Sequence, residues 1–246
     1  MSEKIKNIII SLGFKPKNGE DLIYSKKYTD TEIKIKYNEK TPEKSTIDYG
    51  NIKCHRDTIC NFTKPENAVH LECVTRLLNK GYMAQDIELE KPWQLGHKPG
   101  YLDIFVKDKN NKSFLMIDVK HWDKYESTVQ AATKNEKDQI FSYLQQEPKT
   151  TKAICYYTSR IENGQIIYKN AIVNNKEEWK DLNQEERFNQ WSKTWESNGI
   201  FEDNIPLYKV NSKSILRKEL MVLSKEDSDK LYKQFAEILR HNVHFR

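Results

Sequence analysis

The apolar positions of the chain recur at two spacings, and the changes between them divide it into predicted elements. A short helix is expected over residues 3–12. Strand-like segments follow, the clearest of which is TEIKIKY, with Ile33, Ile35 and Tyr37 alternating with polar residues. We interpret residues 1–60 as an N-terminal accessory segment that forms an α/β layer.

A longer helix is predicted after this segment. The letters TKPE at residues 63–66 have the pattern of a capping box, in which Thr63 and Glu66 satisfy backbone N–H groups at the helix start. We expect the helix to run to about Lys80 and to end at Gly81. Glu66 falls on the apolar side of this helix, and Glu72 projects to the other side. The apolar face consists of Val69, Cys73, Val74 and Leu77.

The remaining periodic segments alternate between strands and helices. Strands are predicted at residues 86–90, 102–107, 113–120, 152–158 and 165–173. One polar helix, from about 127 to 147, is expected to end before Pro148. An Asn-Gly turn favours a hairpin between the last two strands. From residue 65 the order is therefore helix, three strands, helix, strand.

The C-terminal part, residues 176–246, is rich in Trp and in charged residues, and it has a mostly helical pattern. We interpret it as a helical extension. Trp179, Trp191 and Trp195 are expected to pack between helices, and an amphipathic helix is predicted from Ser224 onward.

Composition narrows the possible chemistry. The net charge of +5 permits a polyanionic partner without requiring one. No apolar run is long enough to predict a membrane span, and we expect a cytoplasmic protein. The four cysteines lack metal-site spacing, so buried free thiols are the better interpretation. Neither of the nucleotide-binding motifs GxxxxGK[ST] and GxGxxG occurs. Any catalysis therefore has to come from side chains, with a metal ion as the expected cofactor.

Two of the predicted strands each carry an aspartate. In PGYLDIFVKDKNNKSFLMIDVKHW, a symmetric turn centred on Asn110-Asn111 would place Asp103 directly opposite Asp118. Opposed residues have Cβ atoms about 4.5–5.5 Å apart. Lys120 lies two residues beyond Asp118 and should point to the same face. The sequence therefore predicts two carboxylates and an ammonium group close together.

Such a charged set on a strand can simply face solvent, and that explanation stays open. Here, however, Phe105, Phe114 and Met116 should share the face of the two acids. The opposite face is also apolar, with Leu102, Ile104, Val106, Leu115, Ile117 and Val119. A sheet covered on both sides does not place two acids together without compensation. A divalent metal would provide it, and Lys120 could then act on water or on a phosphate.

These residues resemble the PD-(D/E)XK nuclease motif. The resemblance consists of Asp103, the run Asp118-Val119-Lys120, a preceding helix with Glu66, and an element order like the αβββαβ core of that fold. Gln139 and Tyr143 form a Q-x-x-x-Y on the following helix, a motif that accompanies the nuclease domain of type I restriction-enzyme motor subunits. The chain looks still more like the N-terminal region of single-chain restriction–modification proteins, in which such a nuclease precedes an N6-adenine methyltransferase.

The resemblance implies an α/β, restriction-endonuclease-like core with a mixed central sheet at residues 61–175. It implies a DNA endonuclease that uses Mg²⁺, with Mn²⁺ as a substitute. Double-stranded DNA would be its substrate, and methyltransferase and target-recognition regions of the parent protein would be its partners. The metal ligands would be Asp103, Asp118 and Glu66, the catalytic lysine Lys120, and the supporting residues Gln139 and Tyr143.

The chain departs from the family pattern in two places, and alternatives remain open. The second acid is Asp118 where Glu is commoner, and Leu102 stands where the motif has Pro. Glu66 could serve only the capping box, and Gln139 with Tyr143 could be an ordinary surface pair. The whole domain could also be a non-catalytic DNA-binding or docking module on a degenerate nuclease fold, or a nuclease for RNA or repair.

Overall fold

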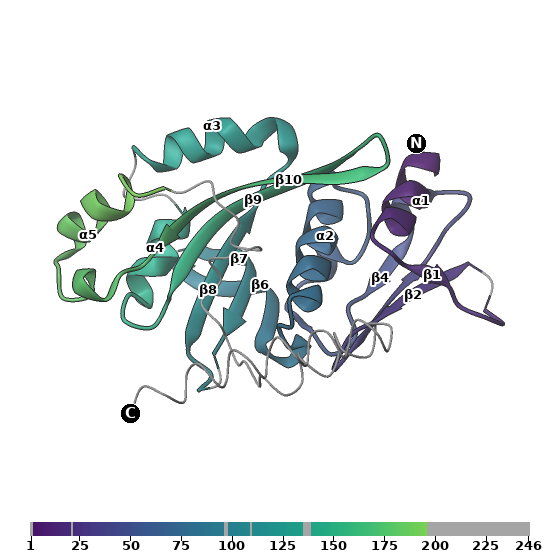
Figure 1. Ribbon diagram of the computed structural model, residues 1–246, viewed down its shortest axis with the longest axis horizontal. Coiled ribbons are helices and arrows are strands. Elements are labelled where there is room, and N and C mark those ends of the chain that lie inside the picture. Colours follow the sequence, from purple (N-terminus) through teal and green to yellow (C-terminus); the bar gives the residue numbers. More distant parts are fainter. Residues whose placement is uncertain (1, 21, 96–97, 109, 135–138, 196–246) are drawn as a thin grey trace, which may run out of the picture. The chain divides into compact units, whose positions relative to one another are not determined.

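Two β-sheets and five α-helices make up the part of the chain that the structure describes (Figure 1). This computed structural model describes residues 2–20, 22–95, 98–108, 110–134 and 139–195. The chain divides into two compact units, 1–208 and 209–246, and all described residues belong to the first. The predictions made for residues 196–246, including the helix from Ser224, lie outside the described residues.

The larger sheet has six strands in the order β10-β9-β8-β7-β6-β5. Their bounds are β5 Lys53–Cys54, β6 Ile87–Leu95, β7 Lys98–Lys107, β8 Ser113–Val119, β9 Ala153–Glu162 and β10 Gln165–Asn174. The pairs β5–β6 and β8–β9 are parallel and the other three are antiparallel, so the sheet is mixed as predicted. Asn163 and Gly164, both at positive φ, form the expected turn between β9 and β10.

The N-terminal residues form helix α1, Ser2–Ser11, and a four-stranded antiparallel sheet. The strands are β1 Lys15–Pro16, β2 Ile23–Lys27, β3 Glu32–Lys36 and β4 Thr46–Asp48, and the short helices η1 Pro42–Lys44 and η2 Asp57–Ile59 lie near them in the chain. Ile33 and Ile35 are fully buried in one hydrophobic cluster that continues into α2 and the larger sheet. The boundary proposed at residue 60 stays a prediction, since side chains on both sides of it share this cluster.

Helix α2, Pro65–Asn79, packs against β8 and β9 on one face of the six-stranded sheet. The predicted capping box is wrong, because Lys64 is the N-cap residue and Thr63 bonds to Asn61 instead. The predicted end is confirmed: Gly81 has φ +97°, and the N–H of Tyr82 donates to the carbonyl of Leu77. A short helix η3, Ala84–Asp86, then leads into β6.

The single helix predicted over 127–147 is also wrong, because the structure has two helices there. These are α3 Trp122–Ala132 and α4 Gln139–Gln146. Helix α3 ends with Thr133 as its C-cap residue, and the N–H of Lys134 donates to the carbonyl of Ala131. Helix α4 packs against β6, β7 and β8 through a second hydrophobic cluster on the other face of the sheet.

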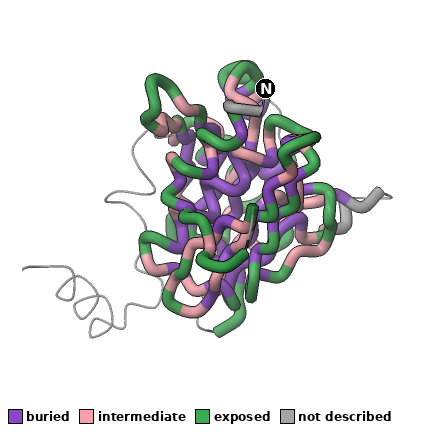
Figure 2. Tube along the Cα trace, turned by 90° about the vertical axis from the view of Figure 1, so that its right-hand side faces the viewer, coloured by how far each residue is buried: buried purple, intermediate pink, exposed green. Residues whose placement is uncertain are grey.

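Two of the three tryptophans expected in the core, Trp179 and Trp191, are buried. Helices η4, Glu177–Trp179, and α5, Gln184–Trp191, supply Trp179 and Trp191, both buried in the second cluster. Trp195 is half-buried and stacks on Tyr156. Buried residues thus form a cluster on each face of the larger sheet. In Figure 2 most buried segments run through the interior and most exposed segments lie at the outside.

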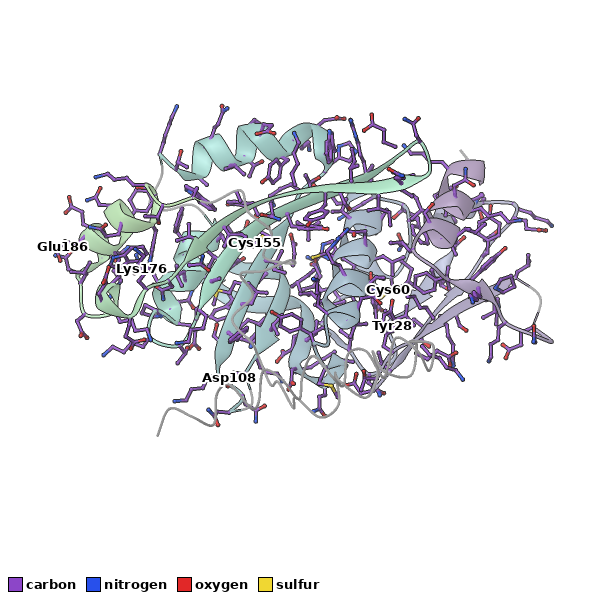
Figure 3. All side chains as sticks on the ribbon, in the orientation of Figure 1. Tyr28, Cys60, Asp108, Cys155, Lys176 and Glu186 are labelled. Atoms are coloured by element: carbon purple, nitrogen blue, oxygen red, sulfur yellow. The ribbon has the colours of Figure 1, made fainter. Side chains whose placement is uncertain are left out.

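All four thiols are free, as expected. Cys73 and Cys155 are buried, and Cys54 and Cys60 are half-buried; Cys60 and Cys155 are labelled in Figure 3. Among the described helices, none has both the length and the apolarity that crossing a membrane would require.

Candidate metal centre

Strands β7 and β8 bring the two predicted aspartates together. Ile104 pairs with Ile117 and Phe105 with Met116, in the register that was predicted to set Asp103 opposite Asp118. The two carboxyl groups are close enough that, in addition to burial, the charge of Asp103 raises the pKa of Asp118. In addition, the backbone N–H of Val119 donates to Oδ2 of Asp103 at 2.5 Å. Asp103 therefore binds the neighbouring strand through its side chain.

The turn between these strands differs from the symmetric one that was expected. The register shifts between Val106 and Lys107, and Lys107 pairs with Ser113. The carboxylate of Asp108, labelled in Figure 3, accepts the N–H groups of Asn110 at 2.8 Å and Lys112 at 2.9 Å. This Asp-centred turn replaces a symmetric hairpin loop but leaves the pairing near the aspartates unchanged.

The alternation of faces along β7 breaks at Asp103. Leu102 packs in the second cluster with Phe105 and Met116, whereas Ile104 packs in the first. The expectation that Leu102 and Ile104 share a face is therefore wrong. Phe114, too, packs in the first cluster and not with Phe105 and Met116. A local irregularity of the strand at Asp103 explains why Leu102 and Ile104 lie on opposite faces.

Strand β6 has a matching irregularity. Leu89 pairs with Ile104 and Lys91 with Leu102, which leaves Glu90 at the level of Asp103. Glu90 has φ +51°, in the left-handed region that few residues other than glycine adopt, and its side chain is almost fully buried. Residues held in such conformations are concentrated at functional sites.

A histidine from α2 completes this cluster. Nε2 of His70 lies 3.7 Å from Oδ1 of Asp103. His70, Glu90 and Asp103 each offer one ligand atom, and these atoms lie within 4.8 Å of one another. Sequence reasoning missed both His70 and Glu90. His70 could have been found from its spacing, because it lies four residues after Glu66 and therefore on the same face of the helix.

The cluster opens into a pocket of about 470 Å³. Its acidic lining residues are Glu66, Glu90 and Asp103, and its cationic ones are Arg56, Lys64 and Lys120. Asp118 is not among the lining residues, because it lies buried behind Lys120. The pocket thus combines carboxylates that suit a cation with basic groups that suit an anion.

Burial raises the pKa of both aspartates. Burial, together with the charge of Asp103, raises the pKa of the Asp118 carboxyl to about 8. Nζ of Lys120 lies 2.8 Å from both oxygens of Asp118. Burial opposes the charge on Lys120, but Asp118 and Asp103 outweigh it and raise the pKa of the ammonium group.

His70 has the properties of a metal ligand. Burial lowers the pKa of its imidazole to about 4, so the ring is neutral at physiological pH. Its Nδ1 is buried and has no hydrogen-bond partner among the described residues. Two carboxylates and a neutral imidazole form a donor set that suits a first-row divalent metal such as Mn²⁺, while carboxylates alone suit Mg²⁺. His70, Glu90 and Asp103 could hold the ion, with Asp118 adjacent.

Gln139 and Tyr143 lie on one face of α4, as their spacing predicted. Nε2 of Gln139 donates to Oη of Tyr143 at 2.5 Å and to the carbonyl of Tyr101 at 3.1 Å. Gln139 lines the pocket. Tyr143 is fully buried against Trp93. The pair therefore joins α4 to the strand that carries Asp103.

Comparison with models of known protein families finds none that matches this chain, and comparison with curated proteins finds no match either. What the pocket does has to be argued from its own chemistry.

Proposed function

We propose that this chain is the metal-dependent endonuclease domain of a restriction–modification enzyme and that it hydrolyses phosphodiester bonds in double-stranded DNA. The observation that carries the proposal is the meeting of Asp103, Asp118 and Lys120 beside a pocket that also holds Glu66, Glu90 and His70. The order α2, β6, β7, β8, helices, β9 is consistent with the restriction-endonuclease-like core that the motif implies.

The side chains have distinct roles in this proposal. A divalent cation held by His70, Glu90 and Asp103 would supply Lewis-acid stabilisation to the scissile phosphate. Lys120, kept charged by Asp118, neutralises the negative charge that develops on the phosphate. Glu66, which faces the pocket without a capping bond, orients the attacking water.

The same resemblance extends the proposal beyond the domain. Methyltransferase and target-recognition regions of the parent protein would protect host DNA and select the site, and the protein would act in the cytoplasm. Mg²⁺ remains the metal that the motif implies, and the imidazole of His70 adds Mn²⁺ as an equal candidate.

Nicking of a supercoiled plasmid tests this function. We expect cleavage in Mg²⁺ or Mn²⁺, and a loss of about 100-fold or more for Asp118→Asn and for Lys120→Ala, because each removes charge from the reacting centre. Asp123→Asn and Lys124→Ala change the same residue types on the exposed surface of α3 and should cut normally. Full cleavage by both site variants would refute the assignment.

Two further measurements separate the alternatives. Duplex binding without any calorimetric signal for Mg²⁺ or Mn²⁺ would favour a non-catalytic DNA-binding module. Competition between duplex DNA and RNA of the same sequence would identify a nuclease directed at RNA.

A further inference from the structure

Arg56 reaches the pocket from the segment between β5 and η2. Its Nη1 lies 3.2 Å from Oε2 of Glu90. The centre of its guanidinium lies 4.4 Å from the centroid of the Tyr101 ring. Its side chain is 40% exposed, so it occupies the rim of the pocket, in contrast to the nearly buried Glu90. Arg56 thus connects the solvent side of the pocket with one member of the metal cluster.

The contact with Glu90 conflicts with metal binding. Glu90 is one of the three residues whose ligand atoms lie within 4.8 Å of one another. A divalent cation at that cluster and a guanidinium on the same carboxylate are like charges in a partly desolvated site, where repulsion is strong. The cation and the guanidinium of Arg56 should therefore weaken each other's binding to the carboxylate of Glu90.

We propose that Arg56 and a divalent cation compete for the carboxylate of Glu90, and that the displaced guanidinium becomes a binding group for a phosphate of the nucleic acid. The inference rests on the proposed function and names one of its substrate contacts. Arginine suits this role because its planar fork matches the oxygens of a phosphate. Lys120 is paired with Asp118 and not with a residue of the metal cluster, so an ion there would not displace it as it would displace Arg56.

The Tyr101 ring allows the guanidinium of Arg56 to move away from Glu90 without leaving the pocket. A guanidinium stacked on an aromatic ring keeps a favourable contact while it turns in the ring plane. Arg56 can therefore leave Glu90 and remain at the rim, where Lys64 and Gln139 also line the pocket. The expected result is a phosphate contact formed from side chains on several elements.

This competition couples the two ligands. If metal frees Arg56 for phosphate, metal binding must increase the affinity for DNA, and DNA must increase the affinity for metal by the same factor. Replacing Arg56 by an uncharged residue should tighten metal binding in the absence of DNA, and it should also reduce the coupling between the two ligands.

The first test is calorimetric titration of the whole chain with MnCl₂. We expect Arg56→Gln to bind Mn²⁺ about fivefold more tightly than the unaltered chain, at the lower end of common coupling factors. Arg160→Gln is the matched control. Arg160 also stacks on an aromatic ring, Trp122, and pairs with a glutamate, Glu162, but it does not line the pocket.

The second test measures binding of a short fluorescent DNA duplex by anisotropy, with and without Mn²⁺. A Lys120→Ala background prevents cleavage during the measurement. We expect Mn²⁺ to strengthen duplex binding when Arg56 is present, and we expect most of that gain to disappear in Arg56→Gln.

The outcomes separate this inference from the proposed function. If the unaltered chain binds Mn²⁺ but Arg56→Gln binds it equally or more weakly, the competition is refuted while the endonuclease proposal stands. If the unaltered chain binds no divalent metal, both are refuted. Equal Mn²⁺-dependent gains in duplex affinity with and without Arg56 would refute the phosphate contact.

Discussion

At the scale of single residues, Asp103 has a structural and an electrostatic role. Its Oδ2 accepts the N–H of Val119, in place of a strand partner, and, in addition to burial, its charge raises the pKa of Asp118. An alanine at this position would leave the Val119 N–H without that acceptor, a cost of about 1–3 kcal/mol for a buried donor. Asn keeps the acceptor, so it is the better substitution for isolating chemistry from folding.

The raised pKa of Asp118 predicts a specific pH dependence of stability. The carboxyl titrates near pH 8 in the folded chain and near about pH 4 when unfolded. Between these values the folded state holds a proton that the unfolded state has released. The free energy of unfolding should therefore fall as pH rises, by at most about 1.4 kcal/mol per pH unit.

The titration of His70 limits the pH range in which this fall in the free energy of unfolding can be observed. Its pKa, lowered to about 4, makes stability rise with pH up to about 6.5, which opposes the effect of Asp118. Urea unfolding in EDTA from about pH 6.5 to 8 should show the decline in the unaltered chain and a much flatter curve in Asp118→Asn. Equal slopes in the two chains would contradict the raised pKa.

At the scale of elements, α2 is fixed to the sheet by a partly buried ion pair whose acid, Glu72, was predicted on the wrong side of the helix. Glu72 was expected on the outer side of the helix, but it is buried. Nη2 of Arg76 lies 2.6 Å from its Oε1, and Oη of Tyr157 on β9 donates to its Oε2 at 2.5 Å. This network holds the helix that carries His70 and Glu66 in place beside the pocket.

Removing one partner of that pair should be costly. We expect Arg76→Met to lower the free energy of unfolding by about 3–5 kcal/mol, because Glu72 would be left buried and unpaired. The double variant Glu72→Leu with Arg76→Met should recover most of the loss. Urea titration measures both, and Arg160→Met serves as an exposed arginine control. A small loss in Arg76→Met would mean that the pair contributes little to seating the helix.

Patterns within elements were predicted well, and contacts between elements were not. The apolar runs predicted strands β7 and β8, and the Asn-Gly pair predicted the β9–β10 turn. The register near the aspartates agrees with the prediction, although the turn at Asn110-Asn111 from which it was inferred differs. The capping box failed because Asn61, close by in the chain, took the bonds of Thr63. The irregularities at Glu90 and Asp103 depend on two strands at once, so no period within one strand could reveal them.

At the scale of the whole described unit, the six-stranded sheet separates two hydrophobic clusters. The first joins the N-terminal sheet to α2, and the second joins α4 to α5. The predicted acid pair lies in the middle of β7 and near the end of β8. Its partners come from elsewhere: His70 from α2, Glu90 from β6 and Arg56 from the segment before η2. Only the fold brings them together, which is why the sequence pointed to the pair alone.

The shared first cluster predicts that residues 1–60 cannot be removed. Their loss takes β5 from the sheet edge and removes Ile33 and Ile35 from the cluster that also contains apolar side chains of α2. We expect the chain without residues 1–60 to lose its cooperative unfolding transition and its near-UV circular dichroism. The chain ending at residue 208 should keep both. A cooperative transition in the first deletion would support an independent domain beginning at residue 61.

The left-handed backbone of Glu90 also bears on how this position should evolve. A non-glycine residue in this conformation costs roughly 1 kcal/mol or more, which glycine would avoid. Random substitution toward glycine or asparagine would therefore ease the backbone, and only a need for the carboxylate opposes that drift. Among proteins with this fold, we therefore expect a carboxylate at this position where the pocket is still functional. We expect glycine where selection on the pocket has relaxed.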